Sequence, residues 1–238
     1  MTICNITVTA DGKRALVTTD SGAAPSSGLG AAPVSENPAN AWRAANTGGG
    51  SVARPTLLMN KLIVFAHLRC VVAIAGEIGP LLQYLGCVGP VPLGVRNIRD
   101  MIAEQRPRMQ EIASRHAGLE FAVAMLGIVP GGVEGYLWSS TQDFEPIDLA
   151  GRSWCMPAVD FNVPANAGLE AEWLGSAESP DPEPFHRRML AAQLAAYHAG
   201  AYPADFCAGA PFTIARLDAG GIHIETIDEA ALARGAGA

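Results

Sequence analysis

Thr2 stands directly behind the initiator methionine, at the head of the alternating pattern in MTICNITVTADG. A neutral threonine hydroxyl is a poor nucleophile and needs a base within hydrogen-bond reach, directly or through one water. A free α-amino group is such a base, because its reference pKa of about 7.7–8 leaves a useful fraction unprotonated at neutral pH. A small second residue favours removal of Met1 by methionine aminopeptidase. Thr2 is therefore either an N-terminal nucleophile or simply the first residue of a strand.

Lysine is scarce in this chain, which contains only Lys13 and Lys61. Lys61 lies within an otherwise apolar run, NKLIVF, although a solvated lysine at the edge of a strand is the ordinary alternative. An ammonium close to an α-amine raises the unprotonated fraction of that amine. Taken singly, Thr2 and Lys61 both have structural interpretations, and only their order along the chain, together with other residues, argues for chemistry.

The sequence contains no motif for metal binding, redox chemistry, serine hydrolysis or phosphate binding. The cysteines are odd in number and include no Cys-x-x-Cys pair, the histidines lack metal-ligand spacing, and no Gly-x-Ser-x-Gly or phosphate loop occurs. We therefore expect buried free thiols, no metal and no cofactor; Cys4, inside a strand and without a free amine, is expected to be structural. The cysteines are Cys4, Cys70, Cys87, Cys155 and Cys207, and the histidines are His67, His116, His186, His198 and His223.

Length and composition favour one domain over residues 1–238, because 238 residues with 49% hydrophobic composition suffice for one sizeable core. Residues 21–54 are rich in Gly, Ala, Ser, Pro and Asn and are expected to form a low-complexity loop insertion. A net charge of -7 argues against nucleic acid or an anionic membrane as partner. Without a signal sequence or an apolar run of about 20 residues, the mature chain is expected to begin at or next to Met1 and to be cytoplasmic.

Four β-hairpins are expected to position these residues. Their strand patterns, joined by turn residues, are 3–9 with 14–20, 56–65 with 69–76, 121–129 with 133–140, and 212–218 with 222–228. Helices are expected at 77–86, 97–116 and 183–198, with a short one at the end of the chain, whereas 151–169 carries no clear pattern. This order predicts an α+β layered sandwich, since each sheet needs one face covered by helices and the other by the opposing sheet.

This arrangement resembles the proteasome β-subunit fold of the N-terminal nucleophile (Ntn) hydrolases, nearest to the bacterial HslV- and Anbu-type proteins, in which four layers follow the order αββα. Four places carry the resemblance. They are Thr2 with the DG turn and Asp20, Lys61 leading into AIAG at Gly76, ADFCAGAPFTI with Asp205, and LGSA with Ser176. The chain departs from the family pattern at Ala208, where a serine is expected.

The resemblance implies a mechanism. Thr2 Oγ attacks the scissile carbonyl while its own amine takes the proton, and Lys61 eases formation of the alkoxide. Asp20 pairs with Lys61 and keeps it charged and oriented. The backbone N–H of Gly76 stabilises the oxyanion, since glycine permits close approach. The resemblance also implies that Asp205 and Ser176 hold the α-amine.

The implied activity is that of a threonine-type peptidase, in a ring or another homo-oligomer and possibly with a separate ATPase. The substrate would be a peptide or a small amide. Two alternatives remain. A small-molecule amidase or acylase is one, because the insertion at 21–54 replaces a loop that helps to shape the substrate pocket. A non-catalytic assembly subunit that retains the fold is the other, because of Ala208 and the weak match at Ser176.

Overall fold

A computed structural model describes residues 3–23, 57–58, 61–76, 83–84, 97–116, 121–162, 164–202 and 208–236. Thr2 and Asp205 lie outside the described residues, as does most of the expected loop at 21–54. The expected helix at 77–86 also lies outside them, except for residues 83–84, which are helical.

The first sheet is antiparallel and has five strands in the order β10-β1-β2-β11-β12. Their bounds are β1 Cys4–Val8, β2 Ala15–Asp20, β10 Arg152–Met156, β11 Phe212–Asp218 and β12 Gly221–Ile227. Strands β1 and β2 form the first predicted hairpin, and β11 and β12 form the last. Because β2 also pairs with β11, with Asp20 opposite Phe212, the two ends of the chain meet in one sheet.

The second sheet has five antiparallel strands in the order β5-β6-β7-β8-β9. Their bounds are β5 Leu62–Phe65, β6 Cys70–Gly76, β7 Phe121–Val129, β8 Gly132–Ser139 and β9 Ile147–Asp148. These strands contain the second and third predicted hairpins. A separate two-stranded ribbon pairs β3 (Gly22–Ala23) with β4 (Leu57–Leu58).

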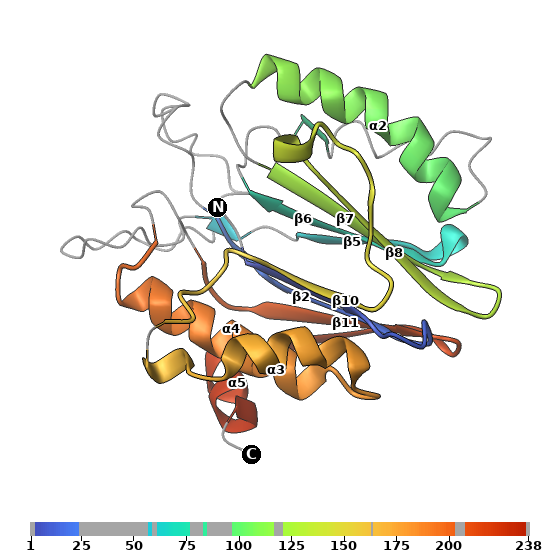
Figure 1. Cartoon of the computed structure of the whole chain (residues 1–238). Coiled ribbons are helices and arrows are strands. Elements are labelled where there is room, and N and C mark those ends of the chain that lie inside the picture. The colour runs from blue at the N-terminus through green and yellow to red at the C-terminus, as the bar shows by residue number, and fades with distance from the viewer. Residues whose placement is uncertain are drawn as a thin grey trace.

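Helices cover the outer face of each sheet, so that the molecule has the predicted four layers (Figure 1). Helix α2 (Ile98–Arg115) lies over the second sheet, while α3 (Leu169–Gly175), α4 (Glu183–His198) and α5 (Glu229–Ala236) lie over the first. Within the described ranges, four short 3₁₀ turns connect elements: η2 Ala66–Leu68, η3 Ser140–Gln142, η4 Pro164–Asn166 and η5 Ser176–Glu178. The expected α+β sandwich of two antiparallel sheets between helices is confirmed.

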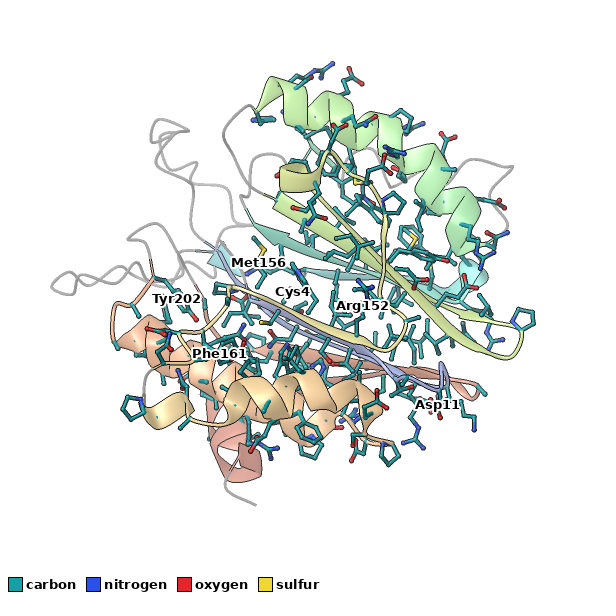
Figure 2. All side chains as sticks on the ribbon, in the orientation of Figure 1. Cys4, Asp11, Arg152, Met156, Phe161 and Tyr202 are labelled. Atoms are coloured by element: carbon teal, nitrogen blue, oxygen red, sulfur yellow. The ribbon has the colours of Figure 1, made fainter. Side chains whose placement is uncertain are left out.

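Strand alternation builds the core between the sheets. On β1, Cys4, Ile6 and Val8 belong to the apolar cluster that joins the two sheets, whereas Ile3 packs with the helical side. Figure 2 shows Cys4 on the face of the first sheet that looks toward the second sheet, with Phe161 on the helical side. Successive side chains at the start of β1 therefore lie alternately between the sheets and under the helices.

Strand β10 lies within the poorly patterned stretch 151–169, and helix α3 begins at its last residue. Strand β10 pairs with β1, from Cys4 opposite Met156 to Val8 opposite Arg152. It packs on both faces, with Trp154 against the inter-sheet core and Cys155 against the helices, so its sequence shows no polar-apolar alternation. Helix α3 begins at Leu169 and is too short to show a helical period.

Candidate active site

Lys61 and Asp20 form a buried ion pair. Lys61 directly precedes β5, and Asp20 is the last residue of β2. The Lys61 Nζ lies 2.8 Å from Asp20 Oδ1, and the two side chains are only 1% and 0% exposed. Lys61 also donates to the carbonyl oxygen of Gly22. These contacts account for two of the three N–H donors of the ammonium.

The same carboxylate holds the beginning of the chain. Asp20 Oδ1 accepts a hydrogen bond from the Ile3 amide at 2.9 Å, and Oδ2 accepts one from the Gly209 amide at 3.1 Å. The register of β1 against β2, with Cys4 opposite Thr19, explains why Ile3 lies beside Asp20. Asp20 therefore ties the start of β1, the start of β5 and the segment before β11 to one point.

Stability alone does not explain such a pair. Removing two charges from water costs several kcal/mol for each ion, and apolar residues of similar volume often stabilise a core as well or better. Titratable groups buried with a specific charge partner concentrate at functional sites. Asp20 and Lys61 therefore mark a candidate site, and the pairing that the resemblance implies between them is present.

Gly76 ends β6 on the same side of the molecule. Its φ of +109° is a conformation that side-chain-bearing residues rarely adopt, so glycine suits this position. The Ile74 amide donates to the Lys61 carbonyl oxygen at 3.0 Å. Because amides two residues apart in a strand point toward the same edge, the Gly76 N–H is directed toward the edge on which Lys61 lies. An amide donor on this edge agrees with the oxyanion role that the resemblance implies for Gly76, and that role stays a prediction.

Cys4 lies beneath this site but is not a nucleophile. Its side chain is 1% exposed. Burial raises the pKa of the Cys4 thiol far above its ordinary value, the Asp20 charge raises it further, and the Lys61 charge opposes them. The thiol is therefore protonated at neutral pH, which agrees with the structural role expected from the sequence.

Ser176 lies elsewhere. Its hydroxyl oxygen is 2.6 Å from Ser153 Oγ and 3.1 Å from Thr7 Oγ1. Thr7 follows Ile3 by four residues on β1, which corresponds to about 13 Å along a strand. The structure therefore does not bring Ser176 to the Lys61–Asp20 pair.

Ser176 instead belongs to a buried polar network with His186, which sequence reasoning did not assign to any site. His186 Nε2 lies 2.9 Å from Thr7 Oγ1, and Nδ1 lies 3.3 Å from Thr18 Oγ1. Burial lowers the pKa of His186 to about 3, against the opposing charge of Glu183, so the ring is neutral. The ring is fully buried, so we assign this network to fastening α4 onto the first sheet, not to substrate.

Two features are absent from the residues that the structure describes. Among these residues, no group of three His, Cys, Asp or Glu side chains could hold a metal ion. No helix in the described ranges is long and apolar enough to cross a membrane. Sequence reasoning missed the Gly209 amide and the Gly22 carbonyl as partners of the ion pair, because backbone groups leave no signature in residue type.

Two facing antiparallel sheets between helix layers give the chain the fold of the proteasome-like Ntn hydrolases. Within that class, the chain is similar to Anbu (ancestral beta-subunit) from Yersinia bercovieri, with a TM-score of 0.65, 12% identity, and coverage of 99% of this chain and 91% of that chain. It is also similar to the Anbu (Gly-1) mutant from Hyphomicrobium sp. strain MC1, with a TM-score of 0.64, 9% identity, and coverage of 100% and 92%. No family model and no curated protein matches the sequence.

Proposed function

We propose that this protein is a threonine-type amide hydrolase in which Thr2 becomes the N-terminal nucleophile once Met1 is removed. The buried Lys61–Asp20 pair carries the proposal. Asp20 binds the amide of Ile3, the residue bonded to Thr2, and consecutive Cα atoms lie about 3.8 Å apart. The residue bonded to Thr2 is thus held by the same carboxylate that binds the ammonium of Lys61.

Lys61 would act on both partners of the proton transfer. Its charge stabilises the alkoxide that forms at Thr2 Oγ, and it favours the unprotonated form of the neighbouring α-amine. The amine then takes the hydroxyl proton and returns it to the leaving amine of the substrate. Asp20 orients the Lys61 side chain through its 2.8 Å contact.

Gly76 would stabilise the oxyanion of the tetrahedral intermediate through its N–H, which faces the Lys61 edge. A fixed backbone donor needs little reorganisation when the charge develops, which is why such donors contribute strongly to catalysis. Asp205 remains the proposed partner of the α-amine. Ser176 is not included, because its hydroxyl is held by Ser153 and Thr7.

The proposed substrate is a peptide or a small acyl amide, and the proposed assembly is a homo-oligomer, with an ATPase partner as a further possibility. Two observations favour a second function, that of a non-catalytic subunit retaining the fold. Ser176 lies away from the ion pair, and the buried Ala208 stands where a serine is expected. The α-amine would then have fewer polar groups to orient it.

Activity of two matched aspartate variants tests the proposal. Asp20→Asn removes the charge next to Lys61, whereas Asp11→Asn changes an exposed aspartate in the β1–β2 turn. We expect Asp20→Asn to reduce peptide or acyl-amide hydrolysis at least 100-fold, while Asp11→Asn retains wild-type rates. Equal activity in both variants contradicts the proposed role of the pair.

Intact-mass analysis of the protein from its native cell separates the two functions. A hydrolase of this type must lack Met1. A protein that retains Met1 cannot use the Thr2 amine, and that result favours the non-catalytic subunit. Comparing unfolded peptides with small acyl amides as substrates then distinguishes the peptidase from the amidase.

A further inference from the structure

A cleft lies at the opposite end of the two sheets from the Lys61–Asp20 pair. It has a volume of about 730 Å³ and is lined by the tips of four turns, two from each sheet. Its lining residues are Lys13, Arg14, Arg69, residues 128–132 and residues 218–220. Arg14 and Asp20 bracket β2, which puts about 20 Å between the cleft and the candidate active site. Figure 2 shows Asp11, in one of these turns, beyond the opposite end of β1 from Cys4.

Backbone hydrogen bonds join the turns that line this cleft. The Val133 amide donates to the Gly12 carbonyl oxygen at 2.7 Å, which joins the β1–β2 turn to the β7–β8 turn. A Cβ atom at Gly132 would lie 2.2 Å from that oxygen, so the two turns are in close contact. The Ile128 amide donates to the Arg69 carbonyl oxygen at 2.9 Å and fixes the third turn. A cleft with such walls exists before a ligand arrives, which lowers the cost of binding.

Two of the lining residues, Arg14 and Arg69, carry positively charged guanidinium groups. Arg14 donates at 2.6 Å to the carbonyl oxygen of Pro180, which lies outside the lining of the cleft, and Arg69 donates at 3.4 Å to the carbonyl oxygen of Ala219, which is part of the lining. Within the ranges that the structure describes, neither guanidinium has a carboxylate within 4.0 Å. Both are held by neutral oxygens, so their charges are not cancelled by an ion pair.

The other charged groups leave this balance positive. Lys13 lies 3.9 Å from Asp11, and both side chains are largely exposed. Asp218, the acidic residue that lines the cleft, accepts the Gly220 amide at 2.7 Å. A local excess of cations in a chain of net charge -7 favours an anionic ligand.

Arg69 also has an uncommon backbone. Its φ of 50° and ψ of 42° are left-handed, a conformation that glycine or asparagine adopts at lower cost. An arginine in this position places a long cation at the cleft, where a smaller residue would serve the turn better. Such outliers support a hypothesis of function when other observations point the same way.

We propose that this cleft binds a small organic anion, in which one carboxylate or phosphate group is attached to an apolar body. The oxyanion binds between Arg14 and Arg69, because the planar fork of a guanidinium group can donate two hydrogen bonds to two oxygens of a carboxylate or a phosphate. The apolar body packs on Ile128, Val129 and Pro130, which line the same cleft. The volume is too large for an inorganic phosphate alone and fits a small ligand. This site is independent of the proposed hydrolase.

Calorimetric titration with three matched probes tests both parts of the proposal. Phenyl phosphate carries the oxyanion and the apolar body, inorganic phosphate lacks the body, and phenol lacks the charge. We expect phenyl phosphate to bind the full chain with a Kd on the order of 0.1–1 mM at low salt. We expect the other two probes to bind at least threefold more weakly. Equal binding of phosphate and phenyl phosphate overturns the role of the apolar body, and no saturation by 10 mM phenyl phosphate overturns the site.

A matched pair of double variants locates the binding. Arg14→Gln/Arg69→Gln removes two charges from the cleft, and Arg115→Gln/Arg188→Gln removes two arginines outside it. We expect the first variant to bind phenyl phosphate at least tenfold more weakly and the second to bind like the wild type. Equal weakening in both variants, or in neither, overturns the proposal. Should the first variant not fold, raising NaCl from 20 to 300 mM with the wild-type protein must weaken binding severalfold, and an unchanged Kd contradicts the proposed charge pairing.

Discussion

Replacing Lys61 by methionine isolates the energy of the buried pair. Methionine is close to lysine in length and apolar volume, so the substitution removes the ammonium with little cavity. Asp20, which is 0% exposed, then loses the partner at 2.8 Å but keeps the Ile3 and Gly209 amides. The change in stability therefore measures what the cation contributes to a buried carboxylate that already has two amide donors.

The expected loss is about 3 kcal/mol. Breaking a buried ion pair by removing one partner typically costs about 3–5 kcal/mol, because it leaves an uncompensated charge. The two retained amide bonds are charge-assisted and partly solvate the carboxylate, which places the loss at the low end of this range. In a chain of this size, that loss lowers the Tm by about 6–12 °C.

Denaturant unfolding of four proteins checks this value. They are the wild type, Lys61→Met, Asp20→Asn and the double variant that combines both changes. We expect the double variant to be less destabilised than the sum of the single variants by about 2 kcal/mol, since neither buried charge remains. The exposed control Lys13→Met should unfold like the wild type. Additive losses, or a Lys61→Met variant as stable as the wild type, would refute the reasoning.

Three further predictions follow from burial and close contact. His186 has its pKa lowered to about 3 by burial, so between pH 6.5 and 3 the unfolded chain binds a proton that the folded protein excludes. This proton makes the stability of the wild type fall with decreasing pH by up to about 1.4 kcal/mol per unit, in addition to the slope from the carboxylates. Urea titrations should therefore show a slope in His186→Gln that is smaller by this amount. Burial raises the pKa of Cys70 to about 12 and also raises that of Cys4 far above its ordinary value. Native protein treated with iodoacetamide at pH 8 should therefore carry no label on either cysteine, whereas urea-unfolded protein should carry a label on both. Peptide mass mapping measures the labelling. A methyl group at Gly132 would lie 2.2 Å from a backbone oxygen, whereas a methyl group at Gly175, in helix α3, would have no neighbouring atom within 4 Å. Gly132→Ala should therefore lower the Tm, and Gly175→Ala should raise stability by about 0.4–1 kcal/mol. The reverse order in thermal unfolding contradicts the packing.

The four hairpins and helix α4 were predictable because their patterns are local. Strand β7 is a nearly continuous apolar run that ends in a Pro-Gly-Gly turn, and α4 spans 183–198 as expected. Strand β10 was not predictable, because Arg152–Met156 contacts apolar groups on both faces and its pairing with β1 joins residues far apart in sequence. In α3 only Leu169 and Trp173 are buried, and two residues cannot establish a period.

The candidate site was predictable only in part. Lys61 stands out in the sequence because a rare lysine interrupts an apolar run, whereas Asp20 was assigned from the resemblance. The structure joins the two as the resemblance implies. Ser176 was assigned from a short Leu-Gly-Ser-Ala match, which does not specify the neighbouring strand residue, and the tertiary fold places it beside Thr7. The cleft near Arg14 and Arg69 combines four turns that are distant in sequence, and no local pattern reveals it.

Labelling by a peptide epoxyketone tests the central claim most directly, because this reagent needs both the hydroxyl and the free amine of an N-terminal threonine. Wild-type protein shown by intact mass to lack Met1 is incubated with the reagent alongside Thr2→Ala, and adducts are mapped by mass spectrometry. We expect one adduct per chain, on Thr2, in the wild type and in Asp11→Asn, and none in Thr2→Ala. A wild-type chain that lacks Met1 and forms no adduct contradicts the proposal that Thr2 is the nucleophile.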